Sequence, residues 1–246
     1  MPSLDSAVRL LKHPSMIAVT LGKPPRLSNQ EAACALLERS ERDIKSFLNE
    51  PSIAEISIHL SSSMREKQIP YESDGWGEFL YAVVRATTPA VVVETGVFHG
   101  VSSTYILRAM ELNGSGKLIS IDLPATTEDV ARESTDRMQS TLLPRGKGPG
   151  WIIPDSLRKR QELRLGDSKD LLPAVLQQPI DIFIHDSLHT FEHMDWEYRR
   201  AWPSIRAGGL LLSDDIFWNP AMHRFSKSVG VPYVQANGKY GGIRKP

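Results

Sequence analysis

Residues 90–122 read AVVVETGVFHGVSSTYILRAMELNGSGKLISID, and this stretch decides the fold. Residues 91–93 are a short run of β-branched valines that is too apolar for a half-exposed strand, which predicts a buried parallel strand. The turn that follows contains Gly96 and Gly100, where the backbone can bend sharply or lie against a ligand because no Cβ is in the way. We therefore expect a buried strand that runs directly into a tight turn.

The second half of the stretch predicts a helix and another strand. Ser102, Ser103 and Thr104 stand where a helix would begin, and apolar residues then recur at helical spacing up to Leu112. Residues 118–121 form a second buried strand that ends at Asp122. The order strand, glycine turn, helix, strand and acid is typical of a parallel α/β fold.

This order also predicts where a ligand binds. In an open parallel sheet the binding crevice lies outside the carboxyl ends of the strands, and both Glu94 and Asp122 fall at that edge. A carboxylate at Asp122 suits a ribose diol because it can accept two hydroxyl hydrogen bonds. The turn has the spacing E-x-G-x-x-x-G, not the G-x-G-x-x-G of a dinucleotide site. Its acid would repel phosphate and accept from an ammonium group, so we expect a nucleoside with a cationic tail; the alternative is an ordinary βαβ turn whose glycines serve packing.

With these features the chain resembles the class I S-adenosylmethionine-dependent methyltransferases. The resemblance implies a Rossmann-like, doubly wound α/β fold with a seven-stranded, mostly parallel sheet, here with a helical N-terminal extension. It places Glu94 near the methionine ammonium, Asp122 on the ribose, and Asp167 with Ser168 near the adenine. The residues that it assigns to S-adenosylmethionine are Glu94, Gly96, Gly100, Ser102, Ser103, Asp122, Asp167, Ser168 and Asp186.

A second group of acids follows two later strands. Asp186 ends the strand predicted at 180–185, and Asp214 and Asp215 end the strand predicted at 210–213. The implied topology puts these strands side by side, so we expect the three carboxylates to converge. Crowded carboxylates raise one another's pKa unless a cation separates them, and a hard divalent cation prefers oxygen ligands. Magnesium is the first expectation, with manganese or calcium open, and helix capping at a solvated edge is the alternative.

Over roughly residues 74–246 the chain resembles one branch more closely, namely the metal-dependent small-molecule O-methyltransferases. This branch includes the macrolide-sugar and catechol types and the cephalosporin-hydroxylase-like group. The resemblance implies that Asp186, Asp214 and Asp215 bind Mg²⁺ and that a hydroxyl of a sugar or another small natural product is methylated. Such loops often carry a base two residues after the first metal-binding Asp, whereas this chain has Leu188 there. His189 is therefore our candidate base, with an ordinary pKa of about 6.5 that suits proton removal near neutrality.

The composition limits the classes of molecule that we expect this protein to bind. The 246 residues contain 29 basic and 29 acidic side chains, so no net field attracts nucleic acid or an anionic membrane. The single cysteine, Cys34, cannot form an intramolecular disulfide or a cysteine zinc cluster. The sequence has no apolar run of the ~18 residues that a membrane span needs, so we expect a cytoplasmic protein. We expect it to act on a small hydroxylated molecule, and it could form a homo-oligomer.

Residues 1–72 are predicted to form a helical cap or lid, or a dimer arm, and residues 73–246 the S-adenosylmethionine-binding domain. Ser28 opens a capping box, which predicts one amphipathic helix up to Pro51. The segment 53–60 fits a helix or a strand. Further helices are expected over 4–11, 127–142 and 217–229, and a mobile loop near 144–150.

Three functions remain open at this stage. The first is the metal-dependent O-methyltransferase. The second is a metal-independent methyltransferase of another small acceptor, in which the three Asp are structural. The third, suggested by Leu188, is a protein that binds S-adenosylmethionine without catalysing transfer, or a relative with another activity.

Overall fold

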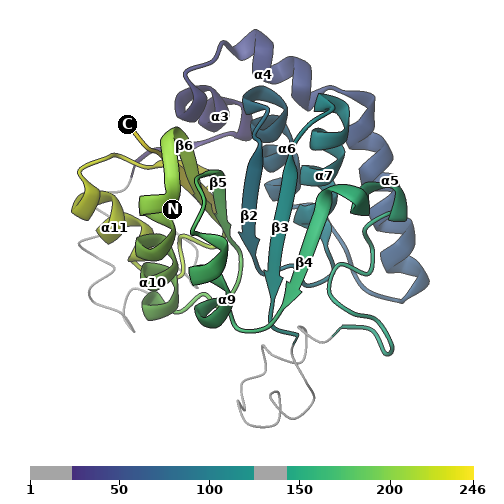
Figure 1. Cartoon of the computed structure of the whole chain (residues 1–246). Coiled ribbons are helices and arrows are strands. Elements are labelled where there is room, and N and C mark those ends of the chain that lie inside the picture. Colours follow the sequence, from purple (N-terminus) through teal and green to yellow (C-terminus); the bar gives the residue numbers. More distant parts are fainter. Residues whose placement is uncertain (1–23, 125–142) are drawn as a thin grey trace, which may run out of the picture.

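The computed structural model describes residues 24–124 and 143–246, and it shows an eight-stranded sheet between two layers of helices (Figure 1). The order of strands across the sheet is β1-β7-β8-β6-β5-β2-β3-β4. The strands are β1 (Arg26–Leu27), β2 (Val91–Thr95), β3 (Lys117–Asp122), β4 (Gln161–Leu165), β5 (Ile180–His185), β6 (Ile205–Ser213), β7 (Val234–Ala236) and β8 (Tyr240–Arg244).

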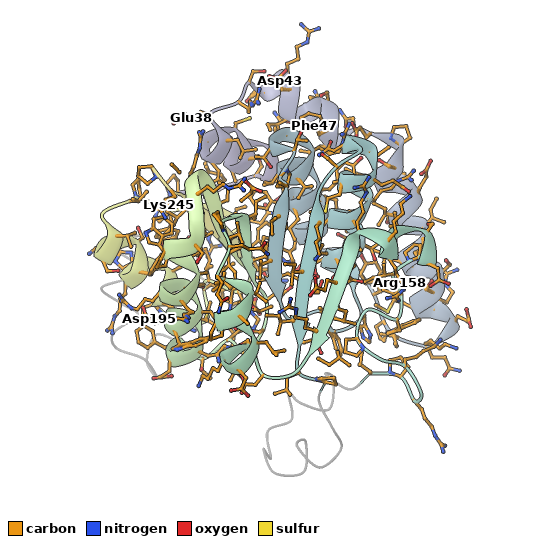
Figure 2. All side chains as sticks on the ribbon, viewed as in Figure 1. Glu38, Asp43, Phe47, Arg158, Asp195 and Lys245 are labelled. Carbon is orange, nitrogen blue, oxygen red and sulfur yellow. The ribbon has the colours of Figure 1, made fainter. Side chains whose placement is uncertain are left out.

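Two separate hydrophobic clusters cover the two faces of the sheet. Alternate strand residues point to opposite faces, so Val92 packs in one cluster and Val93 in the other. The helices of the first cluster are α3 (Asn29–Leu37), α4 (Glu41–Leu48), α5 (Pro51–Glu66), α6 (Trp76–Thr87) and α7 (Val101–Asn113). Those of the second are α9 (Ser168–Val175), α10 (Phe191–Ala201) and α11 (Ala221–Val229). Side chains fill the space between the sheet and both layers (Figure 2).

The topology confirms the predicted Rossmann-like α/β class. Strands β2 to β6 pair in parallel and β8 pairs antiparallel with β6, which agrees with the mostly parallel sheet that the resemblance implied. The sheet has one strand more than expected because Arg26–Leu27 pairs in parallel with β7. The chain proceeds outward from β2 through β3 to β4 and then returns to β5 on the other side of β2. The crevice at this switch point is where ligands bind in such sheets.

The N-terminal extension differs from the prediction in two places. The single helix predicted up to Pro51 is two helices, because Glu38 adopts a left-handed φ of 54° and Ser40 caps a new helix by accepting from Asp43 N. The ambiguous segment 53–60 is helical and lies within α5, whose first residue is Pro51. The helices expected over 4–11 and 127–142 lie outside the described residues.

The described part of the extension shares the core of the sheet domain. Ile44 and Leu60 are fully buried and belong to the same cluster as Phe79 of α6 and Ile106 of α7. The boundary at residue 72 remains a prediction. At the other end of the chain, α11 begins at Ala221 and not at residue 217; its N-cap is Pro220, and Ala221 N donates to Asn219 Oδ1 at 2.9 Å just before the helix. Within the described ranges, no helix has the length and apolarity that crossing a membrane requires.

Candidate active site

The glycine turn lies at the switch point between β2 and β5, and the backbone there is tightly packed. Asp186 N donates to Thr95 O at 2.9 Å, and Gly96 N donates to Ile121 O at 2.8 Å. Gly96 has a φ of 84°, and a Cβ on it would lie 1.9 Å from the carbonyl oxygen of Asp186. Only glycine fits here, because a side chain would displace the end of β5 where Asp186 stands.

Asp122 holds the turn from the end of β3. One of its carboxylate oxygens, Oδ2, accepts from Val97 N at 2.7 Å and from Phe98 N at 2.9 Å. The side chain is 8% exposed, so this acid is partly committed to the turn before any ligand arrives. The assignment of Asp122 to a ribose therefore requires it to act on the turn and on the ligand at once.

A segment after β3 holds the same turn from the other side. Gly150 N donates to Phe98 O at 2.8 Å, Ile152 N donates to His99 O at 3.3 Å, and Trp151 Nε1 donates to His99 Nδ1 at 2.8 Å. Arg158, labelled in Figure 2, donates from Nη2 to Gly150 O at 2.7 Å and anchors this segment. The residues expected to form a mobile loop near 144–150 thus include part of a clamp on the glycine turn.

Glu94 is completely buried in β2, just before the turn. It is 0% exposed, and Oε1 accepts from Ser103 Oγ at 2.5 Å and from Ser120 Oγ at 2.6 Å. The other oxygen, Oε2, is buried and has no hydrogen-bond partner among the described residues. Burial raises the pKa of Glu94 to about 7, although the hydrogen bonds from Ser103 and Ser120 oppose the rise. Glu94 is thus a buried acid with one unused acceptor oxygen.

The remaining residues assigned to the cofactor lie at helix starts. Ser102 is buried in the first turn of α7, whose N-cap is Gly100 with a φ of 95°. Asp167 accepts from Lys169 N at 2.8 Å and caps α9. Ser168 lies 3.2 Å from His193 Nε2, in a buried contact with α10.

The structure brings Asp186, Asp214 and Asp215 together at the carboxyl ends of β5 and β6. The pKa of Asp186 is raised by burial, by the charge of Asp214 and, more weakly, by that of Asp215. Burial and the charge of Asp215 raise the pKa of Asp214 to about 7. Trp76 Nε1, at the start of α6, donates to Asp186 Oδ2 at 3.2 Å, and this hydrogen bond partly offsets the rise in the pKa of Asp186. The sequence alone did not indicate Trp76.

The donor set of this trio suits a hard divalent cation. All three groups are carboxylates, and Asp214 Oδ1 is buried without a hydrogen-bond partner in the described part of the chain. Across residues 24–124 and 143–246, however, no three or more His, Cys, Asp or Glu side chains are already arranged as metal ligands. The described residues therefore offer carboxylate oxygens at this point, but they do not form a preformed metal site.

His189 lies beside this trio, with Nε2 3.9 Å from Asp186 Oδ1. Burial and the charge of His185 lower the pKa of His189 to about 3, which corrects the ordinary value expected from the sequence. The ring is therefore neutral at pH 7, and its Nε2 is buried without a hydrogen-bond partner among the described residues. A neutral ring has one acceptor nitrogen, but with this low pKa the ring alone is a weak base.

Sequence reasoning missed a buried network directly behind His189. Glu197 of α10 is 0% exposed and accepts from Thr95 Oγ1 at 2.6 Å. His185 Nδ1 lies 2.6 Å from Glu197 Oε2, and His193 Nε2 lies 2.9 Å from Glu197 Oε1. The spacing His193-x-x-x-Glu197 on one helix face was the signal that could have indicated it.

The comparisons with known proteins agree with this geometry. Residues 93–216, just over half of the 246-residue chain, match a protein-family model that is described as a methyltransferase domain. The chain belongs to this methyltransferase family. A comparison with curated protein sequences returned no match.

Solved structures resemble this methyltransferase in fold. The O-methyltransferase TomG from Streptomyces achromogenes, involved in tomaymycin synthesis and solved with S-adenosylmethionine, is 18% identical with a TM-score of 0.50. The match covers 78% of this chain and 89% of TomG. The methyltransferase PaMTH1 from Podospora anserina, solved with S-adenosylhomocysteine, is 14% identical with a TM-score of 0.52, and the match covers 80% of this chain and 97% of PaMTH1. The predicted resemblance to the class I methyltransferases is thus confirmed.

The predicted site residues of this methyltransferase lie in three groups. Glu94, Asp122 and the turn form the first, and the three Asp with His189 form the second, both at the carboxyl edge of the sheet. Asp167 and Ser168 form the third, at the start of α9. The first two groups are joined by the backbone hydrogen bond from Asp186 N to Thr95 O. Residues that could face a cofactor therefore lie next to residues that could face a cation.

Proposed function

We propose that this methyltransferase transfers the methyl group of S-adenosylmethionine to a hydroxyl oxygen of a sugar or another small natural product. The observation that carries the proposal is the crowding of Asp186, Asp214 and Asp215 at the switch point, next to the glycine turn. A site that gathers three carboxylates in a chain of zero net charge favours a small neutral or mixed acceptor over nucleic acid.

We assign the turn to the cofactor. S-adenosylmethionine supplies a methyl group that its sulfonium has already activated. Glu94 would face the ammonium of its methionine part, since Oε2 has no partner among the described residues, with Ser102 and Ser103 nearby at the start of α7. Asp122 would accept from the ribose hydroxyls, and Gly96 and Gly100 would allow close approach of the ligand to the backbone.

We keep Asp167 and Ser168 as the contacts expected near the adenine. Asp167 Oδ1 caps α9, so a ligand contact there would use its other carboxylate oxygen or the backbone around the cap. Both side chains also have partners within the protein, Ser168 at His193 Nε2 and Asp167 at Lys169 N.

We assign Asp186, Asp214 and Asp215 to Mg²⁺. When bound, this ion supplies positive charge that lowers the proton affinity of a hydroxyl placed against it. His189 would accept the hydroxyl proton, and Asp186, 3.9 Å from its Nε2, would stabilise the protonated ring. The C–S bond of the sulfonium breaks as the C–O bond forms, so the products are a methyl ether, S-adenosylhomocysteine and one proton.

Calorimetric titration with S-adenosylmethionine and then with Mg²⁺ tests the proposal. An Asp214→Ala, Asp215→Ala double variant should keep cofactor binding and lose Mg²⁺ binding. The exposed Asp155→Ala variant is the control and should keep both. Formation of S-adenosylhomocysteine with a panel of sugars and phenols, with and without EDTA, then identifies the acceptor.

The outcomes separate the candidate functions. Turnover that EDTA does not affect would favour a metal-independent methyltransferase, in which the three Asp are structural. Cofactor binding with no turnover on any acceptor would favour a binding protein without catalysis. A well-folded protein that does not bind S-adenosylmethionine would contradict the assignment as a whole.

A further inference from the structure

Glu197 is a fully buried carboxylate that the proposed reaction does not use. Its Oε2 is bonded to Thr95 Oγ1 at 2.6 Å and to His185 Nδ1 at 2.6 Å. Its Oε1 is bonded to His193 Nε2 at 2.9 Å and to Ser187 Oγ at 3.2 Å. A carboxylate offers about four acceptor positions, so this one is saturated by four donors from three different parts of the fold.

The network keeps Glu197 ionised. Burial would raise its pKa, but the neighbouring His185 and His193 hold the pKa of Glu197 well below its usual range. A buried carboxylate is costly unless all its acceptor positions are used, which is the case here.

An ionised carboxylate has no hydrogen to donate, so its partners must all be donors. His185 must therefore carry its hydrogen on Nδ1, and His193 must carry one on Nε2. The His185 ring in turn packs edge-on against the His189 ring, with centroids 5.3 Å apart and planes at 84°. Glu197 thereby fixes the tautomer and the orientation of the His185 ring, against which the His189 ring packs.

The two neighbours of Asp186 in the sequence both bind Glu197. His185 does so from the end of β5, and Ser187 does so from the loop. A single buried residue on α10 thus holds the chain on both sides of Asp186.

We propose that Glu197 is a positioning residue of the active site, which sets Asp186 and His189 in place through His185 and Ser187. The inference rests on the proposed function, because that function gives Asp186 and His189 their roles. Glu197 itself touches neither the acceptor nor the cofactor.

The test replaces the carboxylate by its amide. A Glu197→Gln side chain has nearly the same shape but one acceptor and one donor group, so the donors cannot all remain paired. Nitrogen–hydrogen NMR correlation spectra of the imidazoles, assigned with single His→Gln variants, report each tautomer. We expect Nδ1–H on His185 and Nε2–H on His193 in the wild type. In Glu197→Gln at least one of the two tautomers should switch, and the His189 signals should shift.

Glu192→Gln is the matched control, because it makes the same change on the exposed side of the same helix. It should leave every tautomer unchanged. Titration with Mg²⁺ adds a functional readout, since loss of outer-shell partners of metal ligands typically costs 10–100-fold in affinity. We expect a loss of about this size in Glu197→Gln, with S-adenosylmethionine affinity unchanged.

A second variant covers the case in which Glu197→Gln does not fold. Ser187→Ala removes only the donor from the loop, so it should weaken Mg²⁺ binding while the tautomer of His185 persists. Wild-type spectra with the hydrogen of His185 on Nε2, or a folded Glu197→Gln variant with wild-type tautomers and His189 signals, would overturn the proposal. Absence of Mg²⁺ binding in the wild type would instead count against the metal site, and the tautomers would still decide the role of Glu197.

Discussion

The raised pKa of Glu94 predicts that this acid makes the folded protein less stable as the pH rises. The pKa is about 7 in the folded state and has its usual value of 4.5 when the chain is unfolded. Between these values the folded state holds the proton while the unfolded state releases it, so the free energy of unfolding falls with pH. The stabilisation is fully present below pH 4.5 and is lost as the pH rises through 7.

The pKa difference sets the size of the effect. At 1.36 kcal/mol for each pKa unit, the loss from Glu94 is on the order of 3 kcal/mol. No correction for solvent screening is needed, because the side chain is 0% exposed. Glu94→Gln replaces the acid by a group that does not titrate, so the loss should disappear in this variant.

Urea denaturation at pH 5, 6, 7 and 8, followed by the fluorescence of the five tryptophans, measures the effect. Other acids also titrate in this range, so the quantity of interest is the difference between wild type and Glu94→Gln at each pH. This difference should move by on the order of 3 kcal/mol in favour of the variant between pH 5 and pH 8. The exposed Glu72→Gln variant should show no such trend. A constant difference between wild type and Glu94→Gln over this range would refute the reasoning.

Three further substitutions test the contacts of the site. Gly96→Ala should lower the free energy of unfolding, measured by thermal denaturation, by at least about 3 kcal/mol, because its Cβ would lie 1.9 Å from Asp186 O. Gly146→Ala is the control: this glycine has a φ of 75° but open space around it, so the loss should be only about 1 kcal/mol. Asp122→Ala removes a charged acceptor from two backbone N–H groups, so it should cost about 3 kcal/mol in urea denaturation. Trp76→Phe keeps the aromatic packing but removes the donor to Asp186, so it should cost about 1 kcal/mol, and wild-type stability would contradict this.

The parallel core was predictable from local patterns. The valines at 91–93, the glycine turn and Asp122 have a fixed order along the chain, and this order is sufficient to place them in a parallel sheet. Asp186 and Asp214 were found in the same way, since each directly follows a short apolar strand.

The network behind the site was not predictable in this way. Glu197 lies on a helix that is polar overall, and its role depends on Thr95 and His185, which only the folded chain brings to it. Trp76 is similar, because a tryptophan at a helix start is read as core packing until its indole N–H is seen on Asp186. The low pKa of His189 also follows from burial, which no local pattern reveals.

The helix boundaries that were wrong had weak local signals. Glu38 ends α3 with a positive φ and without a glycine or proline, so nothing at that position indicated a break. Ser40 followed by Asp43 was a capping signal that could have shown the start of α4.

The clamp on the glycine turn has a consequence for how the chain tolerates changes in length. Asp122, at the end of β3, holds the turn through Val97 and Phe98, and Gly150 returns to hold the same turn through Phe98. Both ends of the connection that leaves β3 are thus tied to one place, independently of what lies between them. We therefore expect a change in the length of the chain between these two anchors to leave the turn in place.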